Sequence, residues 1–275
     1  MYARLMQFVF DLPPIRNFIF RELEKARKEV LKDYPEHLLV KIDKIPYKAP
    51  NVELGDMSEK ESLKGKTSGS RYAVESHSKF IINLSKLFSY ANPLHAESFP
   101  LVKQMEMEVV AMAADFIGLK DEEGKPCGTL TSGGTESILL ALYTYREYAM
   151  REKGVLKPNL VIGETGHAAA IKACHFFDIE VKLVPFDSKY QMHLRKMKAA
   201  IDENTICVYA SYPNYPLGTA DQIDTIGPYC KKKGIPVHAD MCLGGFVAPF
   251  QGNWTMPEGI TSVSADPHKY GLSAK

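Results

Sequence analysis

Three short motifs of this sequence contain residue types that can do chemistry together, and the first is built around a lysine. Lys269 follows Asp266 and His268, just beyond the apolar, β-branched run 260–264. A lysine amine that an apolar wall or a nearby cation keeps neutral can attack an aldehyde. An isolated lysine is usually an exposed surface residue, but the acid and the histidine at a strand end favour a chemical role for Lys269.

The second motif is an acid at the end of another apolar run. Asp240 closes the run 235–239, and a carboxylate at a strand end can form a charge-assisted hydrogen bond with a protonated ring nitrogen. The structural alternative is an acid that caps the Gly244-Gly245 turn after it. His238 lies two residues earlier, so it shares a strand face with Asp240 and is either a supporting partner or plain core.

The third motif, Thr131-Ser-Gly-Gly-Thr-Glu-Ser137, is a glycine turn that opens into an amphipathic helix. The unpaired N–H groups of a helix N-terminus bind phosphate well, and Thr135 adds a hydroxyl. The alternative is an ordinary turn in which Thr135 or Ser137 caps the helix. An amine, an acid and a phosphate-sized turn together predict pyridoxal 5′-phosphate (PLP) as cofactor. His167, at the start of another helix, can stack on its ring or simply be a helix N-terminal residue.

The elements that must position these motifs alternate between strands and helices from Cys127 onward. Short apolar runs predict strands at 128–131, 160–162, 181–184, 206–209, 237–239 and 261–264. Helical periodicity predicts helices from Pro14, at 79–88, 101–117, 135–151, 168–177, 194–201 and 223–233. Such alternation predicts a mostly parallel sheet covered on both faces, with ligands at the carboxyl ends of the strands, where all three motifs fall.

Composition narrows the class of protein. With 275 residues, 45% of them hydrophobic, the chain can bury a real core, and its net charge of +1 gives no footprint for nucleic acid or an anionic membrane. The five cysteines show no C-x-x-C spacing, which argues against a disulfide framework or a metal site and favours a reducing compartment. The apolar start, residues 1–10, is too short to span a bilayer.

The assembled motifs resemble those of PLP-dependent enzymes of fold type I, in the group that includes the amino-acid decarboxylases. Thr131-Ser-Gly-Gly-Thr-Glu-Ser-Ile-Leu139 and Ser264-Ala-Asp-Pro-His-Lys-Tyr-Gly271 are typical of that group. Within it, Asn92-Pro-Leu-His95 and His238-Ala-Asp-Met-Cys-Leu-Gly-Gly-Phe246 are similar to the sphingosine-1-phosphate lyases. Pro267 stands where those lyases carry threonine, which bears on substrate selectivity more than on cofactor binding.

The resemblance implies an α/β fold: a fold type I, PLP-transferase-like large domain with a mostly parallel sheet and helices on both faces, truncated before the small C-terminal domain. Residues 1–95 are then expected to form a helical N-terminal segment and residues 96–275 the PLP-binding large domain, incomplete at its C-terminal end. In family members an antiparallel strand from beyond this point lies between the strand preceding Gly133 and the strand preceding Asp266.

The resemblance also implies a role for each matching residue. Lys269 would hold the cofactor covalently, and Lys269, Tyr72 and His95 would be the catalytic candidates for proton transfer. Lys275 would bind the phosphate of the substrate. The residues implied to bind the cofactor are Gly134, Thr135, His167, Asp240, His268 and Lys269.

The activity that the resemblance implies is retro-aldol cleavage of phosphorylated sphingoid bases into a long-chain aldehyde and ethanolamine phosphate. The alternatives are an α-decarboxylase of glutamate or an aromatic amino acid, against which Lys275 and the 92–95 segment argue, and a catalytically inactive fragment. The resemblance further implies a homodimer with shared active sites. The expected location is cytoplasmic, on the cytosolic face of the endoplasmic reticulum if an N-terminal anchor has been lost.

Overall fold

The structure, a computed structural model, describes residues 75–89, 91–95, 97–119 and 127–274. The chain divides into two compact units, Met1–Lys66 and Thr67–Lys275, and every described residue belongs to the second. The helix expected from Pro14 lies outside the described residues, as does most of the expected N-terminal segment. The domain boundary at residue 95 therefore stays a prediction.

Five strands form one parallel sheet in the order β2-β1-β3-β4-β5. The strands are β1 (Asn159–Gly163), β2 (Glu180–Val184), β3 (Thr205–Ser211), β4 (Val237–Asp240) and β5 (Ser262–Ser264). Each falls where an apolar run of the sequence predicts a strand.

Helices precede and separate these strands. They are α4 (Glu75–Leu87), α5 (Pro100–Ile117), α6 (Gly134–Lys153), α7 (Ala168–Phe176), α8 (Leu194–Ala200) and α9 (Ile223–Lys232), with a 3₁₀ turn, η3 (Ala248–Phe250). None of the helices in the described ranges is long and apolar enough to cross a membrane. The expected α/β architecture, a parallel sheet with helices on both faces, is confirmed.

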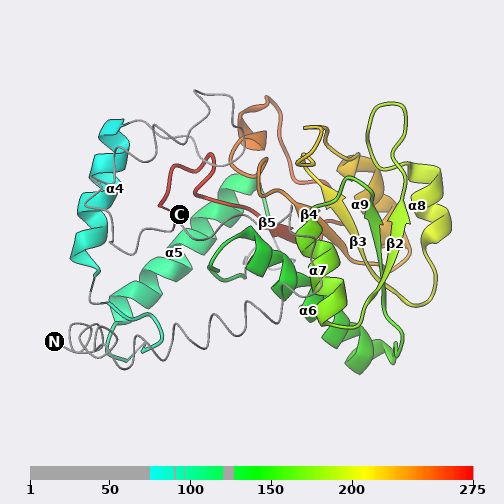
Figure 1. Ribbon diagram of the computed structural model, residues 1–275, viewed down its shortest axis with the longest axis horizontal. Coiled ribbons are helices and arrows are strands. Elements are labelled where there is room, and N and C mark those ends of the chain that lie inside the picture. Colours follow the sequence, from blue (N-terminus) through cyan, green and yellow to red (C-terminus); the bar gives the residue numbers. More distant parts are fainter. Residues whose placement is uncertain (1–74, 90, 96, 120–126, 275) are drawn as a thin grey trace, which may run out of the picture. The chain divides into compact units, whose positions relative to one another are not determined.

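Successive residues of the inner strand β1 pack against opposite layers of helices. Leu160 and Ile162 of β1 join a buried cluster with α6 and α7, whereas Val161 between them joins a cluster with α8 and α9. Figure 1 shows the strands between these two layers. Because both faces are covered, the strands read as continuous apolar runs rather than alternating ones, which is why they can be found from sequence.

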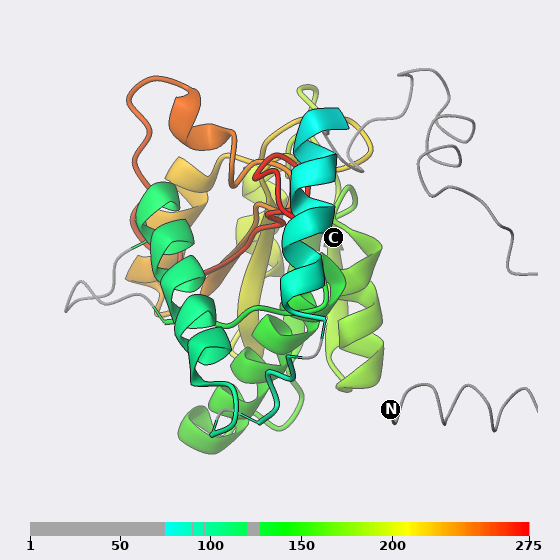
Figure 2. The same cartoon turned by 90° about the vertical axis from the view of Figure 1, so that its left-hand side faces the viewer.

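Helix α5 packs at the β4–β5 end of the sheet. Its last residue, Ile117, joins a buried cluster with Ala239 and Met241, and its carbonyl accepts a 2.8 Å hydrogen bond from the indole of Trp254. Figure 2 shows α5 running past this end of the sheet. Most of the remaining apolar side chains of α5 are exposed.

The expected strand at 128–131 is wrong: this segment is irregular and pairs with no strand among the described residues. The backbone N–H of Leu130 and the hydroxyl of Thr129 both donate instead to the Glu106 carboxylate of α5, at 3.1 and 2.9 Å. A strand requires a hydrogen-bonded neighbour, and β5 is the edge of the sheet on this side. An apolar run alone does not supply that neighbour.

Candidate active site

A cavity of about 300 Å³ opens at the carboxyl ends of the strands. Its wall combines the turn before α6, the start of α7 and the segments that follow β4 and β5. The residues that line it are Ser132, Gly133, Gly134, Thr135, Glu136, Ile138, His167, Cys242, Asp266, His268 and Lys269. The structure thus brings together five of the six residues predicted to bind a cofactor, although they come from three separate parts of the sequence.

The two glycines of the turn are required for different reasons. Gly133, which precedes the first residue of α6, has a φ of 147°, a backbone conformation that side chains disfavour. At Gly134 a Cβ atom would come within 2.8 Å of the Cys242 sulfur and 2.9 Å of an Asp266 oxygen. The helix start therefore lies directly against the cavity wall. No side chain caps the N-terminus of α6, so its backbone N–H groups are open to a ligand.

Lys269 forms a buried ion pair at the cavity. Its Nζ lies 2.7 Å from Oδ2 of Asp266, and the two side chains are only 19% and 7% exposed. The pair is local, because the backbone N–H of Lys269 also donates to the Asp266 carbonyl in the turn after β5. The lysine amine is therefore held at the cavity rather than in solvent, as a reactive lysine would need to be.

Asp240 is buried at the end of β4, next to the cavity rather than in its lining. Its Oδ1 accepts hydrogen bonds from the backbone N–H of Cys242 at 3.1 Å and from the Ser264 hydroxyl at 3.3 Å. Its Oδ2 accepts a hydrogen bond from the Tyr209 hydroxyl at 2.5 Å. The carboxylate is thus a bonded side chain of the strand end and does not cap the Gly244-Gly245 turn through any hydrogen bond of the described structure.

His238 proves to be a supporting partner as well as part of the core. The ring is fully buried, and its two nitrogens lie 2.8 Å from the Ser262 hydroxyl and 3.2 Å from the Ser264 hydroxyl. Burial lowers the pKa of His238 to about 4, against the opposing effect of Asp240. The ring is therefore neutral near pH 7 and links two hydroxyls of β5 beside Asp240.

His167 is the N-cap residue of α7. Its Nδ1 accepts a 3.1 Å hydrogen bond from the backbone N–H of Ala169, which fixes the ring at the N-terminus of the helix. The ring lines the cavity together with residues that follow β4 and β5, and its edge faces Tyr215 at 6.4 Å between ring centroids. This position is compatible with both predictions for His167, a residue at a helix N-terminus and a residue that stacks on the cofactor ring.

The remaining predicted site residues are Tyr72, His95 and Lys275. Tyr72 and Lys275 lie outside the described residues. His95 is described, is exposed, and does not line the cavity. The roles predicted for these three residues stay predictions.

Sequence reasoning did not assign Tyr209 to this site, because an aromatic residue in an apolar run resembles plain packing. Its hydroxyl nevertheless donates to Asp240. Cys242 lines the cavity, and burial together with Asp240 and Asp266 raises the pKa of its thiol, so it is an uncharged wall rather than a nucleophile. Strand register could have indicated Tyr209, because β3 pairs Tyr209 with His238, two residues before Asp240.

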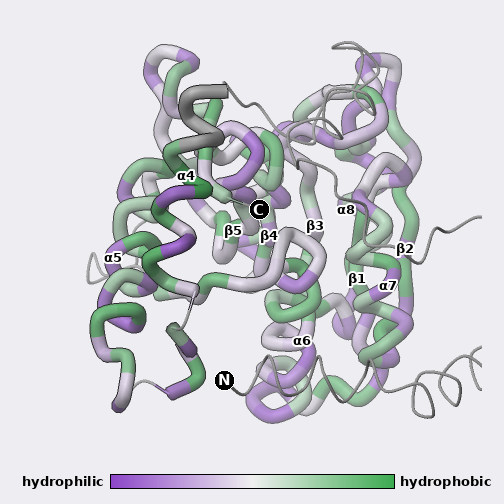
Figure 3. Tube along the Cα trace, turned by 60° about the vertical axis from the view of Figure 1, so that its left-hand side comes forward, coloured by the Kyte–Doolittle hydropathy of each residue, from purple (hydrophilic) through white to green (hydrophobic). Residues whose placement is uncertain are grey.

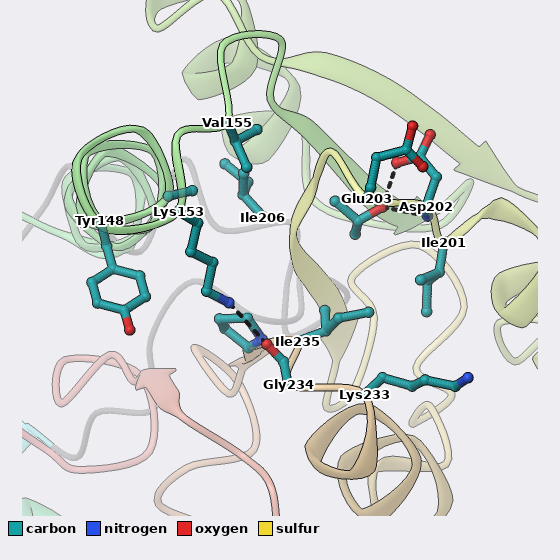
Figure 4. A pocket seen from close by; sticks show the side chains of 13 residues that line it. Tyr148, Lys153, Val155, Ile201, Asp202, Glu203, Ile206, Lys233, Gly234 and Ile235 are labelled. Carbon is teal, nitrogen blue, oxygen red and sulfur yellow. Dashed lines mark hydrogen bonds between the residues drawn. The ribbon is translucent and has the colours of Figure 1, made fainter.

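A second cavity, of about 290 Å³, lies at the opposite, amino ends of β3 and β4 (Figure 4). Its wall includes Tyr148, Asp202 and Lys153, whose Nζ donates to the Gly234 carbonyl at 3.0 Å. None of the predicted site residues that the structure describes lines it. Because ligands of open parallel sheets bind beyond the carboxyl ends of strands, the first cavity is the candidate active site.

The residues of the first cavity fit the predicted cofactor. Lys269 offers an amine, and the uncapped start of α6 with Thr135 and His268 offers donors to a phosphate. Gly134 leaves open the space that a Cβ atom would fill, beside Cys242 and Asp266. The cavity volume lies at the lower end of the roughly 300–1,000 Å³ usual for small-molecule sites. In the described residues no group of histidine, cysteine and acidic side chains has the geometry of a metal site.

Comparison with known proteins agrees with this geometry. The chain is 41% identical over 225 residues to a sphingosine-1-phosphate lyase of Oryza sativa subsp. japonica, covering 77% of this chain and 42% of that protein. It is 36% identical over 296 residues to the sphingosine-1-phosphate lyase of Arabidopsis thaliana, covering 99% of this chain and 54% of that protein. The solved sphingosine-1-phosphate lyase of Burkholderia pseudomallei superposes with a TM-score of 0.73 at 31% identity, covering 88% of this chain and 58% of that one.

The chain spans about half the length of the curated relatives that it matches. Residues 88–274, which include the whole candidate active site, match the pyridoxal-dependent decarboxylase conserved domain. The chain belongs to the pyridoxal-dependent decarboxylase family.

Proposed function

We propose that this chain forms the cofactor-binding part of a PLP-dependent carbon–carbon lyase. The substrates would be phosphorylated sphingoid bases, cleaved into a long-chain aldehyde and ethanolamine phosphate. The observation that carries the proposal is the cavity that gathers Lys269, His268, His167 and the Gly133-Gly134 turn, in a chain whose similarity to named sphingosine-1-phosphate lyases extends over nearly all of its length.

The described residues divide the work of such a site between them. Lys269 would hold the aldehyde of the cofactor, and Asp266 keeps its amine at the cavity wall through the ion pair. The uncapped start of α6, with Thr135 and His268, would bind the cofactor phosphate. Asp240 would bind the ring nitrogen. When bound, PLP supplies a ring that accepts the electron pair released as a bond to the substrate's amine-bearing carbon breaks.

The substrate side of the site rests on residues beyond this cavity. Lys275 would meet the substrate phosphate as a compact positive charge, and Tyr72 and His95 would handle protons. His95 is exposed and does not line the cavity of its own chain. In a dimer it would instead act in the active site of the second subunit.

We infer a homodimer with shared active sites on this basis. Helix α5 supports it, because Leu101, Met105, Met112 and Phe116 recur at helical spacing along it and are 38% to 62% exposed. Figure 3 shows hydrophobic segments along α5 and α4. An exposed apolar stripe of this length indicates a surface that another part of the protein or another subunit covers.

The function is tested by offering the PLP-supplemented protein two classes of substrate and identifying the products. A lyase releases long-chain aldehyde and ethanolamine phosphate from a phosphorylated sphingoid base, whereas a decarboxylase releases carbon dioxide from glutamate or an aromatic amino acid. We expect aldehyde only, and we expect its release to disappear in Lys269→Ala but not in Lys172→Ala, a change of an exposed lysine on α7.

Three results would contradict the proposal. Carbon dioxide without aldehyde would establish the decarboxylase alternative. Binding of PLP without either product would indicate an inactive fragment. Loss of activity in Lys172→Ala equal to that in Lys269→Ala would remove the assignment of the reactive lysine.

A further inference from the structure

The Asp240 carboxylate is held by three hydrogen-bond donors at once. Cys242 donates its backbone N–H and Ser264 its hydroxyl to Oδ1, while the Tyr209 hydroxyl bonds Oδ2. An ionised carboxylate can only accept hydrogen bonds, so each of these three groups must point its hydrogen at Asp240. The two hydroxyls come from strands on either side of β4, which fixes the carboxylate from both flanks.

The direction of the hydrogen bond from Ser264 to Asp240 determines which nitrogen of His238 carries a hydrogen. Because the Ser264 hydrogen points to Asp240, the Ser264 oxygen must accept from Nε2–H of His238, 3.2 Å away. The other nitrogen of the ring then accepts from the Ser262 hydroxyl, 2.8 Å away, which in turn accepts from Tyr145 at 2.6 Å. Burial lowers the pKa of His238, so the ring is neutral, and this chain of donors and acceptors satisfies both of its nitrogens.

The Tyr209 hydroxyl is a committed donor. Tyr209 is fully buried, and its ring lies 5.5 Å from the ring of His238, so packing fixes where the hydroxyl points. Burial and the Asp240 charge raise the pKa of Tyr209 well above its usual value, so the phenol keeps its hydrogen. In the described structure, Asp240 is the partner of this hydroxyl.

We propose that Tyr209 and Ser264 are positioning residues for Asp240: their hydroxyls fix the rotation of the carboxylate so that it can bind a protonated ring nitrogen. The inference rests on the proposed function, because it assigns the ring nitrogen of PLP as the group that Asp240 receives. Neutral His238 acts one step further out, by orienting the Ser264 hydroxyl.

The test compares two cofactors on three proteins. The cofactors are PLP and an analogue in which carbon replaces the ring nitrogen, and the proteins are the wild type, Tyr209→Phe and Tyr229→Phe. Tyr229→Phe is the matched control, since Tyr229 is a half-buried tyrosine of α9 that packs against the α8–α9 cluster and is not a partner of Asp240. Dissociation constants are measured by titration, and thermal unfolding without cofactor checks that each variant folds.

We expect the wild type to prefer PLP over the analogue and Tyr209→Phe to lose most of that preference. PLP binding should weaken by about tenfold, the scale of one hydrogen bond to a charged group. Binding of the analogue, which cannot use Asp240, should hardly change. In Tyr229→Phe the preference should remain. Ser264→Ala provides a second variant, and we expect it to reduce the preference in the same way as Tyr209→Phe.

The possible failures can be told apart. If wild type binds neither compound, the proposed function fails and the inference fails with it. If wild type prefers PLP but Tyr209→Phe and Ser264→Ala weaken both compounds equally, the two residues only pack, and the inference alone is overturned. If Tyr209→Phe fails to fold, Ser264→Ala decides instead, and its affinities for PLP and the analogue are compared in the same way.

Discussion

At the scale of single residues, the site depends on contacts so short that one methyl group matters. Gly134 is the clearest case, because its missing side chain leaves room for the Cys242 sulfur and the Asp266 carboxylate. Asp266 also holds Lys269 in the ion pair. A change at Gly134 therefore reaches both the helix start and the reactive lysine.

Gly134→Ala should impair PLP binding more than it impairs folding. The new Cβ would lie 2.8 Å from the Cys242 sulfur and 2.9 Å from Asp266, and such overpacking typically costs about 1–3 kcal/mol. Asp266 and the start of α6 must shift to make room, and both belong to the cofactor site. We therefore expect PLP affinity to fall by roughly tenfold, or about 1.4 kcal/mol, as measured by titration of the purified protein.

Gly163→Ala is the control for that change. Its Cβ would meet nothing closer than the Met192 side chain at 3.7 Å, an ordinary contact. Equal PLP affinities of the two variants would show that the α6 turn is not part of the cofactor site.

The residues themselves were partly predictable. Lys269 and Asp240 could be found because each follows an apolar run that forms a strand, and parallel strands bring such ends to one edge. The Gly133-Gly134 turn could be found because it opens a helix. Tyr209 could not, since its hydroxyl meets Asp240 only through the pairing of β3 with β4, and pairing depends on the whole sheet. An aromatic residue in an apolar run looks like packing until its neighbour strand is known.

At the scale of elements, the same distinction explains which strands were found. The runs that became β1, β3 and β4 are buried along their whole length between two layers of helices, and this burial accounts for their apolar composition. The segment 128–131, with two threonines and a glycine, pairs with no described strand, and Glu106 bonds its backbone instead. Helices were predicted more closely, because their hydrogen bonds and their periodicity are local.

The pairing of β4 with β5 carries a pH-sensitive element. His238 of β4 bridges two hydroxyls of β5 as a neutral ring, with its pKa lowered to about 4 by burial. In the unfolded chain the pKa would be near 6.5. The unfolded state therefore binds the proton first as pH falls. The stabilisation from a neutral His238 is complete above about pH 6.5 and is lost between there and about pH 4.

We expect the free energy of unfolding to drop by roughly 3 kcal/mol across that interval because of His238 alone, at about 1.4 kcal/mol per pKa unit. His238→Gln, which does not titrate, should flatten the drop, whereas His175→Gln, at an exposed position on α7, should not. Urea unfolding between pH 4 and pH 7.5 measures this. A slope unchanged in His238→Gln would contradict a neutral buried ring.

At the scale of the whole molecule, the described chain has two contrasting surfaces. The sheet is covered on both faces by α6 to α9, and the apolar side chains between the sheet and these helices form two buried clusters. Along α5, Leu101, Met105, Met112 and Phe116 present apolar side chains on one helical face, and the far end of the helix is anchored by Ile117. This face needs a cover that the described residues do not supply.

If a second copy provides that cover, one charge on the stripe should separate the subunits. Met112 is 62% exposed, so Met112→Lys leaves the core of a single subunit unchanged but would bury an ammonium group at the interface. We expect sedimentation at micromolar concentration to give the mass of a dimer for the wild type and of a monomer for Met112→Lys.

Leu156→Lys is the matched control, because Leu156 is 80% exposed in the loop between α6 and β1 and its substitution should leave the dimer intact. A wild type that stays monomeric at high concentration, or a Leu156→Lys protein that dissociates as readily as Met112→Lys, would contradict an interface along α5. In the first case, the exposed stripe must be covered from within one protein, and His95 would lose its route to a neighbouring active site.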